Sequence, residues 1–234
     1  MNAVTWLERT ASTQDEVHRL AAAGAPHGTA VAAKVQSEGR GTRGRTWVSR
    51  EGGLWLSMVC RPEQGTAVEV LGIRVGLALA ELLDALVRPP ARISLKWPND
   101  LLLGSAKIGG ILAEARWQGD KLSWIALGLG LNLRNVVPPG GARLLEAGVM
   151  SHPEELAEPV AHQMAEAART AAPLNAAELS AFALRDWLKG RTVRAPEQGI
   201  AEGISPGGLL RVRTSDGRLT EVVGSVELGL GASA

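Results

Sequence analysis

Two stretches of this chain carry the residue types best suited to chemistry. One is Lys96-Trp97-Pro98-Asn99-Asp100, which is followed eleven residues after its lysine by Lys107-Ile108-Gly109-Gly110. The other, the Gly/Arg loop (residues 39–47), places three arginines among three glycines before an indole. Glycine leaves the backbone free to approach a phosphate, and arginine binds phosphate or carboxylate through two parallel hydrogen bonds. Together they predict a site for a nucleotide.

Lys107 is the best catalytic candidate, because the glycines after it leave room for a ligand near its ammonium group. A point cation there can hold a carboxylate against an α-phosphate and neutralise charge that develops in the transition state. Asp100 can bind Mg²⁺ or accept a proton from an amine, and Asn99 can contact a sugar or phosphate. Each feature also has an ordinary interpretation: a solvated basic turn, an exposed lysine that begins a strand, and an Asx turn.

Composition excludes several classes of protein. The 234 residues carry a net charge of +1, so no field of the whole molecule draws it to nucleic acid or to a membrane. Cys60 is the single cysteine, which excludes an internal disulfide and a cysteine-based metal cluster and fits a reducing compartment. The longest apolar stretch, 68–87, contains four charged residues, too many for a bilayer span. We therefore expect a cytoplasmic protein without a membrane or nucleic-acid partner.

Hydrophobic periodicity and turn residues predict both strands and helices. Strands are expected at 4–9, 29–36, 54–61, 93–97, 107–117 and 122–133, and helices at 13–23, 67–87, 153–171 (with a break at Pro159) and 175–188. After Lys189-Gly190 the chain changes to short Val/Leu-rich runs cut by glycine turns, typical of a small β-barrel or sandwich. This predicts a larger domain over residues 1–189 and a small β domain over 190–234.

With these motifs in this order, the chain resembles the biotin–protein ligases. The Gly/Arg loop and the Lys96–Asp100 motif together are the most specific part of the resemblance, which extends over nearly the whole chain. The other matching pieces are Ser12-Thr13, Gln36, Gly53 with Ser57, Lys107 to Gly110 with Glu114, and Gly128-x-Gly130-x-Asn132. The resemblance implies an α+β fold: a mixed β-sheet with flanking helices, akin to class II aminoacyl-tRNA synthetases and lipoate ligases, followed by a small SH3-like β-barrel.

The resemblance also implies roles for individual residues. The implied catalytic residues are Lys107, Asp100 and Arg40, with Asp100 as a candidate Mg²⁺ ligand. The implied biotin-binding residues are Ser12, Thr13, Gln14, Gln36, Arg40, Gly41, Thr42, Trp47, Lys107 and Gly110. The implied ATP-binding residues are Arg40, Arg43, Arg45, Trp47, Asn99, Asp100, Lys107 and Asn132.

The implied activity is a two-step ligation. Biotin reacts with Mg·ATP to give biotinyl-5′-adenylate and pyrophosphate, and the biotinyl group then passes to a lysine of a biotin carboxyl carrier domain. Two alternatives stay open: attachment of lipoate or octanoate, which shares the fold, and a biotin-responsive binding module without turnover. We expect the Gly/Arg loop to be mobile in the free protein and ordered with biotin or its adenylate.

Some features bear on the form of the enzyme. The matching motifs begin at residue 12, so we expect the short form that lacks a DNA-binding domain. Gln14 stands where the family usually has asparagine, and Thr42 where it often has arginine. A homodimer is an option, because the edge strand of an open sheet can pair with a second copy.

Overall fold

A computed structural model describes residues 3–228 of the chain. The larger of its two sheets has seven strands in the order β1-β2-β3-β7-β6-β5-β4. They are β1 (Thr5–Thr10), β2 (Ala30–Gln36), β3 (Leu54–Cys60), β4 (Ile93–Lys96), β5 (Asp100–Leu103), β6 (Ala106–Gln118) and β7 (Lys121–Leu131). β1 runs parallel to β2 and every other neighbouring pair is antiparallel, so the sheet is mixed, as expected.

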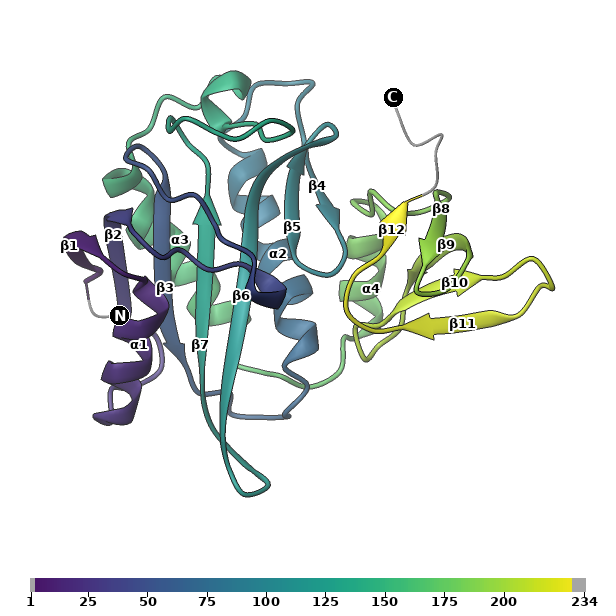
Figure 1. Cartoon of the computed structure of the whole chain (residues 1–234), viewed down its shortest axis with the longest axis horizontal. Helices are drawn as coiled ribbons and strands as arrows, with labels where there is room; N and C mark the ends of the chain where they lie inside the picture. The colour runs from purple at the N-terminus through teal and green to yellow at the C-terminus, as the bar shows by residue number, and fades with distance from the viewer. Residues whose placement is uncertain (1–2, 229–234) are drawn as a thin grey trace.

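Helices cover both faces of this sheet (Figure 1). They are α1 (Thr13–Ala22), α2 (Glu69–Asp84), α3 (Pro153–Ala167) and α4 (Ala176–Ala183), with short 3-10 helices η1 (Thr42–Gly44) and η2 (Leu144–Ala147). α1 packs on one face through Val17 and Ala21, against Val31, Val59 and Ala126. Because side chains alternate along a strand, the residues on either side of those three strand positions belong to the larger core on the opposite face.

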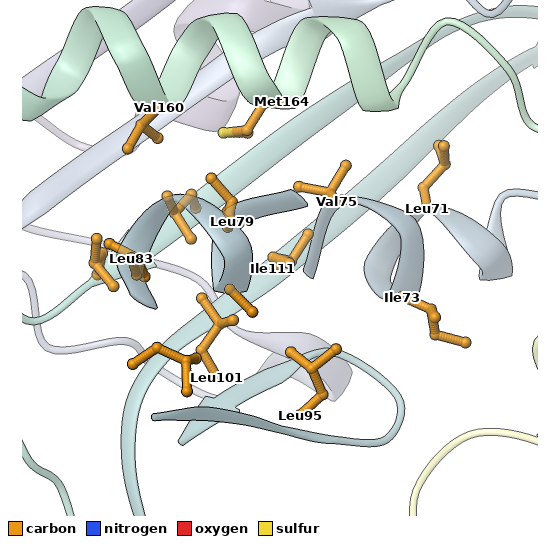
Figure 2. Packing of buried hydrophobic residues seen from close by; sticks show 14 of the residues in the cluster. Leu71, Ile73, Val75, Leu79, Leu83, Leu95, Leu101, Ile111, Val160 and Met164 are labelled. Atoms are coloured by element: carbon orange, nitrogen blue, oxygen red, sulfur yellow. The ribbon is translucent and has the colours of Figure 1, made fainter. Parts of the chain in front are cut away.

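The larger core lies between the sheet and helices α2 and α3 (Figure 2). Its buried side chains include Leu71, Val75, Leu79 and Leu83 from α2, Val160 and Met164 from α3, and Leu95, Leu101 and Ile111 from the strands. The four-residue spacing on α2 gives the apolar stripe of an amphipathic helix, and each buried leucine stabilises the fold by about 1.5–3 kcal/mol. α2 in turn supports the Pro98-Asn99 corner, since a Cβ on Gly72 would lie 3.0 Å from the Pro98 carbonyl oxygen.

The ends of the helices follow the expected capping residues. Ser12 is the N-cap of α1, and its hydroxyl accepts a hydrogen bond from the Gln14 N–H at 3.3 Å. The capping box of Asn175 and Glu178 begins α4, which ends at Ala183 rather than near residue 188. The predicted break at Pro159 is wrong, because α3 continues through it. Pro159 lies on the exposed side of α3, where water can satisfy the carbonyl that its missing N–H leaves free.

The C-terminal strands form a second, smaller sheet beside the first (Figure 1). Its order is β11-β10-β9-β8-β12, from β8 (Thr192–Ala195), β9 (Gly199–Ile204), β10 (Leu210–Arg213), β11 (Leu219–Val222) and β12 (Glu227–Leu228). Within residues 3–228 this sheet is open, because its edge strands β11 and β12 do not pair with each other. The expected closure into an SH3-like barrel is therefore not confirmed.

Buried hydrogen bonds hold the smaller sheet against the rest of the chain. The indole of Trp97 donates to the Gly208 carbonyl at 2.7 Å, and the Leu174 N–H donates to the Pro206 carbonyl at 2.7 Å. The residue before the Pro98-Asn99 corner is thus bonded to the turn between β9 and β10. Among the described helices, none combines the length and the apolar character needed to span a membrane.

Helix α2 is also held by a buried ion pair. Arg74, 7% exposed, donates to both carboxylate oxygens of Glu178 at 2.5 and 3.1 Å and to the carbonyls of Thr170 and Ala172. Burial raises the pKa of Glu178, but hydrogen bonds from Arg74 and from the Asn175 backbone outweigh it, so the net pKa is lowered. The charged form of Glu178 therefore stabilises the fold.

We predict that Glu178→Gln lowers the free energy of unfolding by up to about 3 kcal/mol at pH 7, because it leaves the Arg74 charge buried without its partner. The folded pKa of Glu178 lies below the unfolded one, so this stabilisation is present above the unfolded pKa, about 4.3, and is lost as the pH falls through the folded value. Urea unfolding of both proteins at pH 7 and pH 3 measures this. A difference of equal size at both pH values would contradict it.

Candidate active site

A cavity of about 330 Å³ opens on the face of the sheet that α1 covers, just beyond the N-terminus of that helix. Three glycines clear the sheet surface there: Gly128 and Gly130 on β7, and Gly110, which pairs with Gly130 across β6. Gly128 and Gly130 lie at alternate positions from Ala126, which packs under α1, so they face the same side of the sheet. Gly110 faces that side too, as the cross-strand partner of Gly130. Side chains at these positions would fill the cavity. Its volume suits a small organic ligand.

The floor of the cavity is a hydrogen-bonded chain of side chains. Gln36, at the end of β2, accepts through Oε1 from the backbone N–H of Thr13 at 2.7 Å and from its hydroxyl at 3.0 Å. The Gln36 amide nitrogen donates to Ser49 Oγ at 2.7 Å. Ser57 Oγ lies 2.7 Å from Thr13 Oγ1. Since the single hydroxyl proton of Thr13 goes to Gln36, Ser57 is the donor in that pair, and its lone pairs are left to accept.

Gln14 supplies a second acceptor at the same place. Its amide nitrogen donates to the Ala126 carbonyl at 3.3 Å, whereas its Oε1 atom is buried and has no hydrogen-bond partner. A Cβ placed on Gly128 would lie 3.1 Å from Gln14 Oε1 and 3.2 Å from Ser57 Oγ. The two acceptors therefore converge on one point above Gly128. A buried acceptor without a partner is unfavourable, so this point is built for a ligand that donates hydrogen bonds.

Lys107 and Trp47 meet above Gly110, where a Cβ would lie 3.3 Å from Lys107 Nζ and 3.5 Å from the Trp47 ring. The Lys107 ammonium nitrogen lies 5.0 Å from the centroid of the Trp47 ring and 2.5 Å from Asp100 Oδ1. Both atoms of the ion pair belong to partly exposed side chains, 32% for Lys107 and 19% for Asp100. The indole lies so close to Gly130 that a Cβ there would come within 2.5 Å of Trp47 Nε1, a buried donor that lacks a partner. The Trp47 indole therefore covers the surface formed by Gly110 and Gly130.

The Gly/Arg loop is folded over the cavity by its own backbone. The Trp47 N–H donates to the Gly39 carbonyl at 2.8 Å, and the Gly41 N–H donates to the Arg45 carbonyl at 2.7 Å. Arg45 also donates to the carbonyl and hydroxyl of Thr42. Arg43, at the turn, adopts a left-handed conformation with φ 60°. The structure therefore shows one ordered arrangement of the loop, and its expected mobility in the free protein stays a prediction.

Asn99 and Asn132 bond mainly to the protein itself. The Asn99 amide nitrogen donates to the Ile111 carbonyl at 2.5 Å, and the Ile111 N–H donates back to the Asn99 carbonyl at 2.9 Å. Asn132, 5% exposed, donates to the Ala142 carbonyl at 3.2 Å and accepts from Asn135 Nδ2 at 3.0 Å. Both amides fix the backbone around the cavity. Their implied contacts with the nucleotide stay predictions.

Most of the sequence-predicted residues line the cavity. They are Ser12, Thr13, Gln14, Gln36, Arg40, Gly41, Thr42, Arg45, Trp47, Asn99, Lys107, Gly110 and Asn132. Asp100 and Arg43 do not line it. Asp100 reaches the site through its ion pair with Lys107. The Arg43 guanidinium instead lies beside Gly224, between β11 and β12, so closely that a Cβ on Gly224 would collide with it.

Although Ser57, Gly128 and Gly130 belong to the motifs of the family resemblance, no site role was assigned from the sequence to the other lining residues. They are Leu56, Ser57, Ile111, Leu112, Gly128, Leu129, Gly130 and the turn 138–141, together with Thr46 and Val48 of the loop. The turn is visible in the sequence as Pro138-Pro139-Gly140-Gly141, but nothing there indicates that it folds back onto Lys107. In the structure the Lys107 N–H donates to the Gly140 carbonyl at 3.3 Å.

The side chains around the cavity provide too few ligands to bind a metal ion without help from a bound nucleotide. Within residues 3–228, no three His, Cys, Asp or Glu side chains gather as metal ligands. Asp100 gives one carboxylate. Mg²⁺ is commonly bound through one or two carboxylates together with the phosphates of a nucleotide, so Asp100 fits an ion that arrives with its nucleotide.

Comparisons with known proteins agree with this geometry. Residues 6–132 match the model of the biotin/lipoate A/B protein ligase family. A biotin–[acetyl-CoA-carboxylase] ligase of Paracoccus denitrificans is 35% identical over 241 residues, which cover 96% of this chain and 99% of the relative. A bifunctional ligase/repressor of Bacillus spizizenii is 29% identical over 93% of this chain and 71% of its own length.

Solved structures give the same result. The biotin protein ligase of Aquifex aeolicus in complex with biotin and ATP has a TM-score of 0.79 at 25% identity, over 98% of this chain and 100% of that one. The ligase of Leishmania major in complex with biotinyl-5-AMP has a TM-score of 0.63 at 25% identity, over 96% and 100% of the two chains. The segment matched by the family model contains the Gly/Arg loop, the Lys96–Asp100 corner, Lys107 and Asn132. The chain therefore belongs to the biotin/lipoate A/B protein ligase family.

Proposed function

We propose that this protein is a biotin–protein ligase. It activates biotin with Mg·ATP to biotinyl-5′-adenylate and pyrophosphate, and then transfers the biotinyl group to a lysine of a biotin carboxyl carrier domain. The observation that carries this proposal is the pair of buried acceptors, Gln14 Oε1 and Ser57 Oγ, that converge above Gly128. The relatives named as biotin ligases support it over nearly the full length of the chain.

The two acceptors favour biotin over the other acids that this family handles. The ureido ring of biotin carries N–H donors that can satisfy Gln14 and Ser57. Lipoate has a dithiolane ring and octanoate a plain alkyl chain, and neither has an N–H group. Either ligand would leave the Gln14 carbonyl buried without a partner, which costs about 1–3 kcal/mol, or roughly 5- to 150-fold in binding.

Lys107 serves the first step. A carboxylate oxygen of biotin attacks the α-phosphorus of ATP, the bond from that phosphorus to the bridging oxygen breaks, and pyrophosphate leaves with the electron pair. Negative charge grows on the phosphoryl oxygens, and a fixed ammonium group stabilises it. Trp47, stacked on Lys107 and on the Gly130 surface, keeps water from the mixed anhydride. Bound Mg²⁺ would neutralise phosphate charge, with Asp100 as its protein ligand.

Asp100 has a second possible task, in the transfer step. The amine of the carrier lysine attacks the acyl carbon, AMP leaves, and the amine loses a proton. An unperturbed lysine has a pKa of about 10.4, so at neutral pH it needs a base or a desolvated site. Asp100 Oδ1 lies 2.5 Å from Lys107 Nζ, so its carboxylate is close to the place proposed for the phosphate and the acyl group. We assign it the role of base, with the metal ligand as the competing role.

A biotin-responsive module without turnover remains the second candidate. It would need the ureido acceptors but not the Lys107–Asp100 pair, whose presence favours an enzyme.

We further propose that residues 1–189 form the catalytic domain, that residues 190–234 form an SH3-like module, and that the protein acts in the cytoplasm. Pairing of two copies through an edge of the sheet is also part of this proposal.

ATP–pyrophosphate exchange with different acids tests the choice of substrate. Biotin should support exchange far better than lipoate or octanoate. Gln14→Leu should lower kcat/KM for biotin roughly 5- to 150-fold, because it removes one ureido acceptor, and should change the weak exchange with octanoate much less. Gln118→Leu, at the exposed tip of the β6–β7 hairpin, is the matched control and should behave as wild type. Exchange with lipoate but not with biotin would overturn the proposed function.

Lys107→Ala should slow adenylation about 10²- to 10³-fold, the usual loss when one group that stabilises transition-state charge is removed. Single-turnover formation of biotinyl-adenylate measures the step directly. Lys96→Ala is a suitable control, because Lys96 lies over the Trp187 ring, away from the cavity. A Lys107→Ala enzyme that keeps more than about a third of the wild-type rate would remove Lys107 from the catalytic residues.

Asp100→Asn separates the two steps, since it keeps the shape but removes both the base and the negative charge. We expect slower transfer from preformed biotinyl-adenylate to an apo carrier domain, with a smaller loss in ATP–pyrophosphate exchange. Rapid-quench single-turnover assays give both rates. If transfer is unchanged while exchange collapses, Asp100 is a metal ligand rather than the base.

A further inference from the structure

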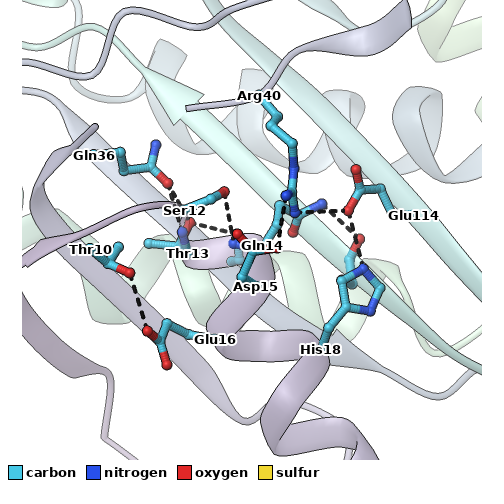
Figure 3. A network of polar contacts seen from close by, with 12 residues as sticks. Thr10, Ser12, Thr13, Gln14, Asp15, Glu16, His18, Gln36, Arg40 and Glu114 are labelled. Carbon is cyan, nitrogen blue, oxygen red and sulfur yellow. Dashed lines mark hydrogen bonds and ion pairs between the residues drawn. The ribbon is translucent and has the colours of Figure 1, made fainter. Parts of the chain in front are cut away.

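The first arginine of the Gly/Arg loop is bonded to two carboxylates from different elements (Figure 3). Arg40 Nη1 lies 2.7 Å from Asp15 Oδ1, on the first turn of α1, and Arg40 Nη2 lies 3.3 Å from Glu114 Oε2, on β6. Arg40 therefore ties the loop to both the helix and the sheet that frame the cavity. The loop's internal hydrogen bonds give it shape, but they do not attach it to either element.

The Glu114 carboxylate also contacts His18. His18 Nε2 lies 3.1 Å from Glu114 Oε2, the same oxygen that Arg40 reaches. The indole N–H of Trp124 donates to His18 Nδ1 at 3.1 Å. Because Nδ1 accepts, the proton of neutral His18 lies on Nε2 and is donated to Glu114. Trp124 thus sets the tautomer of His18, and His18 sets the position of the Glu114 carboxylate.

The sequence spacing makes this arrangement possible. Asp15 and His18 are three residues apart on α1, so they share one face of the helix. Glu114 lies four residues after Gly110 on β6, so it projects from the same face of the sheet as the glycines under the cavity. These residues therefore form one polar cluster at the rim of the site. His18 is 13% exposed, whereas the carboxylates are partly open to water, 54% for Asp15 and 33% for Glu114.

We propose that Asp15 and Glu114 are a dock that holds the Gly/Arg loop closed through Arg40, and that His18 and Trp124 are positioning residues that orient Glu114. Arg40 then acts as a latch in this closed arrangement. Its catalytic consequence rests on the proposed function: a closed loop keeps biotinyl-adenylate in the cavity until a carrier lysine arrives. The dock itself does not depend on that function, because it consists of contacts between residues of this chain.

Protease cleavage of the free protein tests the dock without any ligand. Trypsin should cut at Arg43 and Arg45 faster in Asp15→Asn and in Glu114→Gln, by up to roughly fivefold each, the range expected for partly exposed ion pairs. The double variant should be cut faster still. Cutting at Arg218, in the exposed turn between β10 and β11, is the internal reference and should not change. Wild-type rates in the double variant, with its fold verified by circular dichroism, would overturn the proposal.

A neighbouring acid on the same helix gives a matched control. Glu16 bonds Thr10 and Arg19 rather than Arg40, so Glu16→Gln should leave the cutting rate of the loop unchanged. Faster cutting in Glu16→Gln would mean that any loss of charge on α1 loosens the loop, which contradicts a specific dock. A double-mutant cycle completes the test, since Glu114→Gln should add little once Arg40→Gln has removed the latch. Additive effects at Arg43 and Arg45 would contradict the proposed pairing.

His18 variants distinguish positioning from simple packing. His18→Phe keeps the ring but loses the Nε2 donor, and should increase loop cleavage about as much as Glu114→Gln. His18→Gln can still donate to Glu114 and should restore most of the protection. In single-turnover assays with biotin and ATP, the dock variants should release more biotinyl-adenylate into solution than wild type. Wild-type protein that fails to exchange biotin would refute the proposed function but leave the cleavage results intact, whereas unaltered cleavage refutes the dock alone.

Discussion

The site depends on the two-residue period of strands β6 and β7. That period puts Gly110, Gly128 and Gly130 on one face of the sheet and leaves large apolar side chains for the other face, where α2 and α3 cover them. A shift of either strand by one residue would fill the cavity with leucine and isoleucine and bury glycine in the core. The antiparallel pairing of β7 with both β3 and β6 fixes this register over most of its length. The pairing at the centre of the sheet therefore fixes the positions of the three glycines.

The polar groups around this glycine surface come from segments of the chain that begin or end beside it. α1 begins at the floor, and β2 ends beside it, so Thr13 and Gln36 meet at 2.7 Å although 23 residues separate them. Their mutual hydrogen bonds use the available donors and leave Gln14 and Ser57 as acceptors. The hydrogen-bonded network of the site therefore satisfies Thr13 and Gln36 and leaves the acceptors of Gln14 and Ser57 for a ligand. Such groups would be unfavourable in a core whose only task is stability.

The sequence predicted most of this fold, and the exceptions have physical causes. Strong periodicity located α1 and six of the seven strands of the larger sheet, and Ser12 and Asn175 were recognisable as caps. The four-residue strand β5 (Asp100–Leu103) was not predicted, because it is too short to show a period. The continuation of α3 through Pro159 was not predictable from local preference, because it depends on that residue facing water while its neighbours are packed. Closure of the C-terminal strands also depends on pairing between distant short segments. Turn spacing alone does not determine that pairing.

For the site, residue types predicted Lys107 and the arginine loop, and the family resemblance added Gln36, but neither indicated their partners. The contact of Arg40 with Asp15 and Glu114 joins residues 25 and 74 positions apart, and no local pattern relates them. Both key cations are in fact neutralised within the protein, Lys107 by Asp100 and Arg40 by the two rim carboxylates. In the proposed reaction, a phosphate of the nucleotide would replace Asp100 as the partner of Lys107. Arrival of the phosphate would release the Asp100 carboxylate from Lys107, and Asp100 could then accept the proton of the carrier lysine. On this proposal, the Lys107–Asp100 ion pair keeps the base occupied until the nucleotide is bound.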